Sequence, residues 1–175
     1  SYAEWYLNGL LNGDTARLKY HEKNYGKDFP YEDFIKLFNP TNYDPAKWAS
    51  LFEKAGAKYV ILTSKHHDGF CLWPSKQSDG YNSVDGPAKR DLLGDLNIEV
   101  KKKGIKSGFY YSLYEWEHQD YPGDISSYVD NYMLPQLKDA VQMYKPDIIF
   151  SDGEWDRHSA EWKSEEFLAW LYNNS

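Results

Sequence analysis

Cysteine is nearly absent from this sequence: Cys71 is the only one among 175 residues. A single cysteine can form no disulfide within the chain and excludes a zinc site built from several cysteines. No apolar stretch reaches the roughly 18 residues of a membrane-spanning helix, so we expect no membrane partner. Basic residues are too few to give a positive surface, since the net charge is −7 at pH 7. We therefore expect no nucleic-acid partner either.

Aromatic residues, by contrast, are abundant and make up 18% of the chain. Their rings fill hydrophobic cores and can also stack on the apolar faces of sugars. For any single aromatic residue, packing in the core is the more common role. A charged fraction of 27% is typical of a globular protein. The length fits one domain over residues 1–175.

Helix and strand patterns alternate from Asp44 onward. Asp44-Pro45 has the pattern of a helix N-terminus, apolar residues then recur at helical spacing, and Gly56 is typical of a helix end. Residues 58–63 are apolar and β-branched, as in a buried strand. The pattern then repeats and predicts helices at 91–103, 126–144 (with a break at Pro135) and 164–172, and strands at 107–112 and 147–150. Before Asp44 we expect irregular structure, with short helices near 4–11 and 31–37.

This alternation predicts an α/β fold with about three parallel strands and helices between them. A doubly wound sheet and a (β/α) barrel both fit the pattern. In either fold, ligands bind at the carboxyl ends of the strands. The residues that follow positions 63, 111 and 150 are therefore the candidates for chemistry.

Polar residues follow the first strand closely, as Lys65-His66-His67-Asp68-Gly69. Histidine is a common metal ligand, but no third ligand stands at a suitable spacing. Hydrogen bonding to a polyol fits the pattern better than a metal site. Alternatively, Asp68-Gly69 simply forms a turn and the histidines line a loop.

The other two strand ends each offer one candidate. Because successive strand residues point to opposite faces, only one of Tyr110 and Tyr111 can face a site. Asp152 follows the third strand and is itself followed by glycine. Barrel enzymes hold catalytic groups at this position, although an Asp-Gly turn gives the same pattern. Glu154 and Asp156 lie further out, and we expect them in solvent.

Four parts of the chain carry motifs that are more specific than a helix or strand pattern. They are residues 55–70 with 72–75, Lys89-Arg90-Asp91-Leu92, Gly108-Phe109-Tyr110-Tyr111-Ser112, and residues 144–155 with Ser151-Asp152-Gly153. In order and spacing they resemble the α-L-fucosidases of glycoside hydrolase family 29. The resemblance extends from Glu4-Trp5-Tyr6 nearly to Ser175. It is more specific than any one motif within it.

The resemblance implies a retaining exo-glycosidase on part of an irregular (β/α)8 TIM-like barrel. Such an enzyme hydrolyses terminal α-L-fucose from glycoconjugates or oligosaccharides through a covalent glycosyl-enzyme, with no cofactor and no metal. The resemblance implies that Asp152 is the nucleophile. It also implies that His66, His67, Glu4 and Trp5 contact sugar hydroxyls and that Tyr110 lies against the sugar. Phe150 is implied to pack against the C5 methyl group, at a position where many relatives have tryptophan.

The resemblance also places three parts of the family's architecture outside these residues. They are a first barrel strand before Ser1, a general acid/base glutamate after Ser175, and a C-terminal β-sandwich. We therefore assign the acid/base role to no carboxylate of this chain, Glu115 and Glu154 included. The resemblance implies a fucosylated glycan as partner and a lysosomal, periplasmic or secreted location. An oligomer is compatible with it.

Two alternative functions remain at this point. One is a non-catalytic fucose-binding relative, against which the presence of Asp152 argues. The other is a metal-dependent barrel hydrolase that uses His66 and His67, which would require a bound metal for activity.

Overall fold

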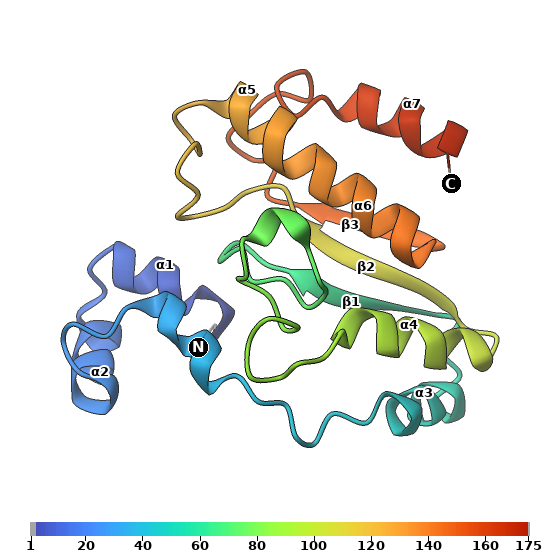
Figure 1. Ribbon diagram of the computed structural model, residues 1–175, viewed down its shortest axis with the longest axis horizontal. Coiled ribbons are helices and arrows are strands. Elements are labelled where there is room, and N and C mark those ends of the chain that lie inside the picture. The colour runs from blue at the N-terminus through green and yellow to red at the C-terminus, as the bar shows by residue number, and fades with distance from the viewer. Residues whose placement is uncertain (1–2, 175) are drawn as a thin grey trace.

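The computed structural model describes residues 3–174 and contains a parallel sheet of three strands in the order β1-β2-β3. The strands are β1 (Tyr59–Lys65), β2 (Lys106–Ser112) and β3 (Ile148–Asp152). Figure 1 shows their carboxyl ends directed toward the same side of the molecule, where the N-terminal helices also lie. The expected α/β fold with three parallel strands is confirmed.

Helices alternate with the strands as predicted. They are α3 (Pro45–Lys54), α4 (Leu92–Lys102), α6 (Leu134–Tyr144) and α7 (Ser164–Asn174). Aspartate caps the first two, because Asp44 accepts a hydrogen bond from Lys47 N and Asp91 accepts one from Gly94 N. Such caps satisfy backbone N–H groups that have no partner inside the helix.

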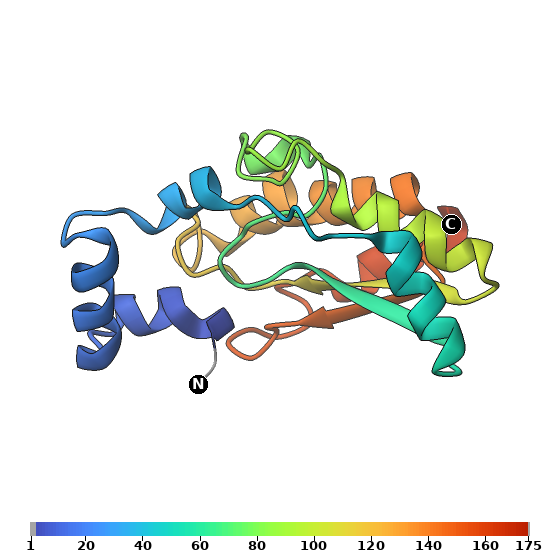
Figure 2. The ribbon, with the colours of Figure 1, turned by 90° about the horizontal axis from the view of Figure 1, so that it is seen from below.

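One face of the sheet carries helices α4 and α6, whereas the other carries none among the described residues (Figure 2). The core lies on the covered face, where Phe109 and Tyr111 of β2 pack with Leu137 and Val141 of α6. Full burial of one such apolar side chain stabilises a fold by about 1.5–3 kcal/mol. On the open face, the side chain of Phe150 remains 53% exposed.

Over the paired stretch, β1 has one residue more than β2, because residues 59–65 pair with residues 106–111. Thr63 pairs with Tyr110 and Lys65 pairs with Tyr111, so Ser64 has no partner in the ladder. This is a β-bulge, which changes the face that the following residues occupy. Ser64 Oγ donates to Tyr110 O over 2.6 Å and fixes the bulge. Lys65 consequently points to the covered face, with its Nζ 4.3 Å from the centre of the Tyr111 ring.

The N-terminal part is more regular than the sequence predicts. The short helices expected near 4–11 and 31–37 are present as η1 (Ala3–Trp5) with α1 (Tyr6–Leu11), and as η2 (Tyr31–Leu37). Between them lies a helix that we did not predict, α2 (Thr15–Tyr25). Asp14 caps it through Ala16 N and Arg17 N. Its weak amphipathic pattern explains the omission, although Asp14 and Gly26 mark its two ends.

Several boundaries differ from the predictions further along the chain. Strand β1, predicted to end at residue 63, ends at Lys65. The helix predicted at 126–144 consists of α5 (Ile125–Tyr128), a π-helical turn η4 (Val129–Met133) and α6. The break thus falls before Pro135, which lies in the first turn of α6. Strand β3 also runs two residues further than predicted and ends at Asp152 itself. A three-residue helix, η3 (Lys76–Ser78), lies in the connection between β1 and α4.

Candidate active site

Asp152 is the last residue of β3 and lies at the carboxyl end of the sheet. Its Oδ2 accepts a hydrogen bond from the hydroxyl of Tyr110 over 2.6 Å. Its Oδ1 accepts one from the backbone N–H of Gly153 over 2.8 Å. Both oxygens of this half-buried carboxylate are therefore held in place by groups of known position.

Gly153 lets the chain turn directly behind this carboxylate. Its φ is +84°, a left-handed conformation that glycine adopts without steric cost. A Cβ at this position would lie 2.6 Å from Cβ of Tyr114, which is a severe overlap. The Asp-Gly pattern therefore marks a turn and a candidate catalytic carboxylate together.

Tyr110 lies on the open face of the sheet between two other rings. Its ring stacks on that of Phe150, with centroids 5.8 Å apart, and on that of His66, with centroids 5.9 Å apart. Burial, and then the hydrogen bond to Asp152, raise the pKa of the Tyr110 phenol, so it remains a neutral donor. Tyr111 is fully buried on the other face, which confirms that only one tyrosine of the pair faces the site.

His66 follows β1 and has a polar atom without a protein partner. Its Nδ1 is buried and forms no hydrogen bond with residues 3–174. A buried polar atom of this kind needs a water or ligand partner, because leaving it unpaired costs free energy. Burial lowers the pKa of His66, although the carboxylates of Asp68, Asp152 and Glu4 oppose the shift.

His67 is buried behind His66, and their ring centroids are 4.0 Å apart. Its Nδ1 lies 2.6 Å from Oγ of Ser112, the last residue of β2. Burial lowers the pKa of His67 to about 4, with His66 as the next cause. Four aromatic rings surround it, with centroids 5.2–5.5 Å from its own: Trp5, Tyr114, Trp116 and Trp155.

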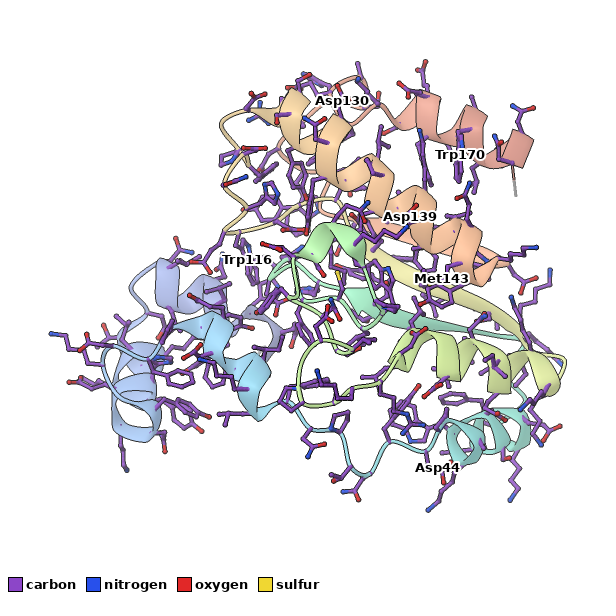
Figure 3. The ribbon with its side chains drawn as sticks, viewed as in Figure 1. Asp44, Trp116, Asp130, Asp139, Met143 and Trp170 are labelled. Carbon is purple, nitrogen blue, oxygen red and sulfur yellow. The ribbon has the colours of Figure 1, made fainter. Side chains whose placement is uncertain are left out.

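Glu4 and Trp5 come from η1, far from the strands in sequence. Trp5 reaches the sheet and contacts Trp116 as well as His67, with ring centroids 5.3 Å apart for the tryptophan pair. Figure 3 shows Trp116 at the end of the sheet that faces the N-terminal helices. Glu4 is exposed, and its charge acts on His66.

All seven residues singled out in the sequence therefore lie around the carboxyl ends of the three strands. Sequence reasoning missed Ser112, Tyr114, Trp116 and Trp155, which enclose His67. The signal available was their position, since all four come within five residues of the ends of β2 and β3. Which of these aromatic residues reach His67 depends on strand register, which the sequence does not state.

Two other residues of the polar run 65–69, which begins at the end of β1, have structural roles. Lys65 forms a buried ion pair with Glu115 on the covered face, and its Nζ lies 3.2 Å from the Tyr111 hydroxyl. Asp68 accepts hydrogen bonds from the Tyr31 hydroxyl over 2.9 Å and from Phe70 N over 3.3 Å. The second bond closes a turn, as the Asp68-Gly69 pattern suggested.

Asp68 and Glu115 also line a polar hollow of about 720 Å³ beside the site. Within residues 3–174, no group of three or more His, Cys, Asp or Glu side chains is arranged to hold a metal ion. The described helices also include none with the length and apolar character needed to cross a membrane.

A carboxylate with imidazole and aromatic groups at the carboxyl ends of parallel strands is an arrangement found in α/β enzymes that hydrolyse glycosides. The sequence profile of the family described as Alpha-L-fucosidase matches residues 1–175. This chain therefore belongs to the α-L-fucosidase family.

Individual relatives agree with the family match. The Alpha-L-fucosidase of Dictyostelium discoideum is 45% identical over 185 residues, which cover 99% of this chain and 40% of that protein. The Tissue alpha-L-fucosidase of Rattus norvegicus is 44% identical, over 98% of this chain and 38% of that protein. A crystal structure of the Thermotoga maritima alpha-fucosidase in complex with fucose is 43% identical, with a TM-score of 0.84, over 98% of this chain and 43% of that one. The chain thus spans about two fifths of the length of these relatives.

Proposed function

We propose that the protein to which this chain belongs is a retaining α-L-fucosidase, with Asp152 as its nucleophile. The observation that carries the proposal is the placement of Asp152, with one oxygen fixed by Tyr110 and the other by Gly153. A nucleophile held in one orientation loses little freedom when it attacks, which favours reaction. The fucose in the Thermotoga maritima structure supports the choice of sugar.

The chemistry would be a double displacement. Asp152 attacks the anomeric carbon while a second carboxyl group, about 5–5.5 Å from the first, protonates the departing oxygen. Water then attacks the glycosyl-enzyme, and the second carboxylate accepts its proton. Glu115 is committed to the buried pair with Lys65, so we seek this acid/base glutamate beyond Ser175.

The remaining residues would bind the sugar. His66 has an unpaired nitrogen that can bond with a hydroxyl, and Glu4 and Trp5 approach the same strand ends. Phe150 offers an exposed apolar ring beside Tyr110, a suitable surface for the methyl group of a 6-deoxy sugar. We further propose a terminal fucose of a glycoconjugate or oligosaccharide as substrate, a (β/α)8 barrel as the complete catalytic domain, and a lysosomal, periplasmic or secreted location.

The test is the full-length Asp152→Gly variant, assayed with an aryl α-L-fucoside. Turnover should fall by several orders of magnitude, because the covalent route is lost. Added azide should partly restore turnover and give the β-fucosyl azide, since a single displacement inverts the anomeric carbon. Asp156→Gly, which removes an exposed carboxylate from the same loop, is the matched control and should remain active. Near wild-type turnover by Asp152→Gly would show that Asp152 is structural.

A further inference from the structure

The hydrogen-bond chain behind His67 determines which of its ring nitrogens carries the proton. Ser112 Oγ lies 2.6 Å from His67 Nδ1 and 2.6 Å from the carbonyl oxygen of Tyr114. A carbonyl oxygen can only accept, so the hydroxyl must donate its single proton to Tyr114. The contact with His67 then requires a donor on the ring. Nδ1 of His67 is therefore protonated.

The other nitrogen, Nε2, is consequently a bare acceptor. Burial keeps the ring neutral at neutral pH, because the pKa of His67 is lowered to about 4. A neutral imidazole carries one proton, and that proton is already on Nδ1. No donor among residues 3–174 forms a hydrogen bond with Nε2. The four surrounding aromatic rings hold the plane of the imidazole and oppose a flip that would exchange its nitrogens.

We propose that Ser112 is a positioning residue that fixes His67 as an obligate hydrogen-bond acceptor, so that the sugar hydroxyl at Nε2 must donate. This inference rests on the proposed function, in which His67 contacts the sugar. Ser112 itself touches no substrate and acts through the histidine. The consequence is a selection for a free hydroxyl: a sugar carrying an ether, a fluorine or a further glycosyl group at that position has no proton to donate. His67 would thereby help to restrict the enzyme to terminal, unsubstituted fucose.

The first experiment measures the tautomer directly in the full-length protein. Nitrogen-15 NMR of labelled histidine, with His67 assigned by its loss in His67→Gln, should show a protonated Nδ1 and an unprotonated Nε2 at neutral pH. In Ser112→Ala the signals should move toward the opposite tautomer or an exchanging mixture. Ser83→Ala is the matched control, since Ser83 is also a buried serine whose hydroxyl donates to a carbonyl oxygen, that of Arg90, over 2.7 Å. It should leave the His67 signals unchanged.

The second experiment links the tautomer to recognition of the sugar. Competitive inhibition is measured for L-fucose and for its analogues with one hydroxyl replaced by fluorine, which can accept but cannot donate. At one position the wild type should lose about two- to tenfold in affinity through the missing donor, and Ser112→Ala should lose less there. Ser83→Ala should show the wild-type pattern.

The possible outcomes separate this inference from the proposed function. A protonated Nε2 or a charged ring in the wild type at neutral pH overturns the inference, and that measurement needs no folded variant. A fluorine penalty that Ser112→Ala leaves unchanged at every position also overturns it. If L-fucose does not bind and no fucoside is hydrolysed, the proposed function fails, whereas the NMR result still decides the tautomer.

Discussion

At the scale of single residues, the contact between Tyr110 and Asp152 joins two adjacent strands at the point where we expect the sugar to react. A neutral phenol donating to a carboxylate both orients it and stabilises its charge. The same phenol is stacked between His66 and Phe150, so its position is set by rings as well as by the bond. The Tyr110 side chain thus contacts both the proposed nucleophile and the aromatic surface that would bind the sugar.

Removal of that hydroxyl should lower activity without unfolding the protein. In full-length Tyr110→Phe, kcat/KM for an aryl α-L-fucoside should fall about 10- to 100-fold, because hydrogen bonds to charged groups contribute about 1.5–3 kcal/mol. Steady-state kinetics measure this directly. Tyr144→Phe is the matched control, since the Tyr144 hydroxyl also donates to a carboxylate, Asp91, over 2.8 Å, and Tyr144 lies in the core of the covered face. A larger loss in the control than in Tyr110→Phe would refute the assigned role.

Residues of the site differ in how far the sequence predicts them. Asp152 and His66 are candidates by one rule, that chemistry lies at the carboxyl ends of parallel strands. The same rule left the choice between Tyr110 and Tyr111 open, and the family resemblance selected Tyr110. Ser112 and its contact with His67 do not follow from the rule. The two residues are 45 positions apart, and their proximity depends on the bulge at Ser64, which no alternation pattern reveals.

At the scale of elements, an ion pair joins the last residue of β1 to the segment that follows β2. Lys65 is completely buried and its partner Glu115 nearly so. Taking two charges out of water is costly, and the pair offsets this cost only while both partners are present. It connects the residue before His66 to the residue before Trp116, and so ties two candidate site segments together behind the open face.

Replacing one residue of the Lys65–Glu115 pair should therefore lower the stability of the protein more than replacing both. Full-length Lys65→Met leaves Glu115 as an unpaired buried charge and should lower the free energy of unfolding by about 3–5 kcal/mol. The double variant Lys65→Met/Glu115→Leu should recover a large part of that loss. Urea denaturation of the four proteins of this double-mutant cycle gives the coupling. Lys102→Met, which breaks the exposed pair with Glu99, should cost no more than about 1 kcal/mol. Additive effects at Lys65 and Glu115 would contradict this account.

The sequence predicted most elements from Asp44 onward because caps, glycines and periodicity agree there. It placed the break near Pro135 but could not place the π-helical turn before it, since η4 keeps the apolar pattern of a helix. It ended β3 too early because Ser151 and Asp152 are polar, although their backbone still pairs with β2. Polar residues at a strand end indicate a site, but they also lead a sequence-based prediction to end the strand too early.

At the scale of the whole molecule, the sheet has helices on one face and two outer strands, β1 and β3, without a second neighbour among the described residues. Its open face exposes large rings, including Tyr59 at 58% and Phe150 at 53%. Closing a barrel covers such edges and fills its interior with side chains. The sequence predicted this parallel sheet, whereas the closed barrel remains part of the proposal.

A polypeptide of these 175 residues, expressed alone, should accordingly associate and fail to turn over. Unpaired edges and exposed rings favour self-association. Without a group to protonate the departing oxygen, Asp152 could at most be glycosylated by a fucoside with a very good leaving group. Size-exclusion chromatography and an aryl-fucoside assay check both parts. A monomer that melts cooperatively and performs multiple turnovers would place the acid/base within these residues, with Glu154 as the first candidate.

The bulge at Ser64 also affects how this segment can change during evolution. Ser64 is the residue of β1 outside the ladder, so its deletion would leave Thr63 opposite Tyr110 and Lys65 opposite Tyr111, with their side chains on the faces that they now occupy. Deletion of a paired residue would instead shift the pairing of its neighbours by one and move their side chains to the opposite faces. In functional homologues, a one-residue gap between residue 59 and His67 should therefore fall at residue 64, and an alignment that needs one elsewhere in this strand marks a protein whose strand serves a different purpose.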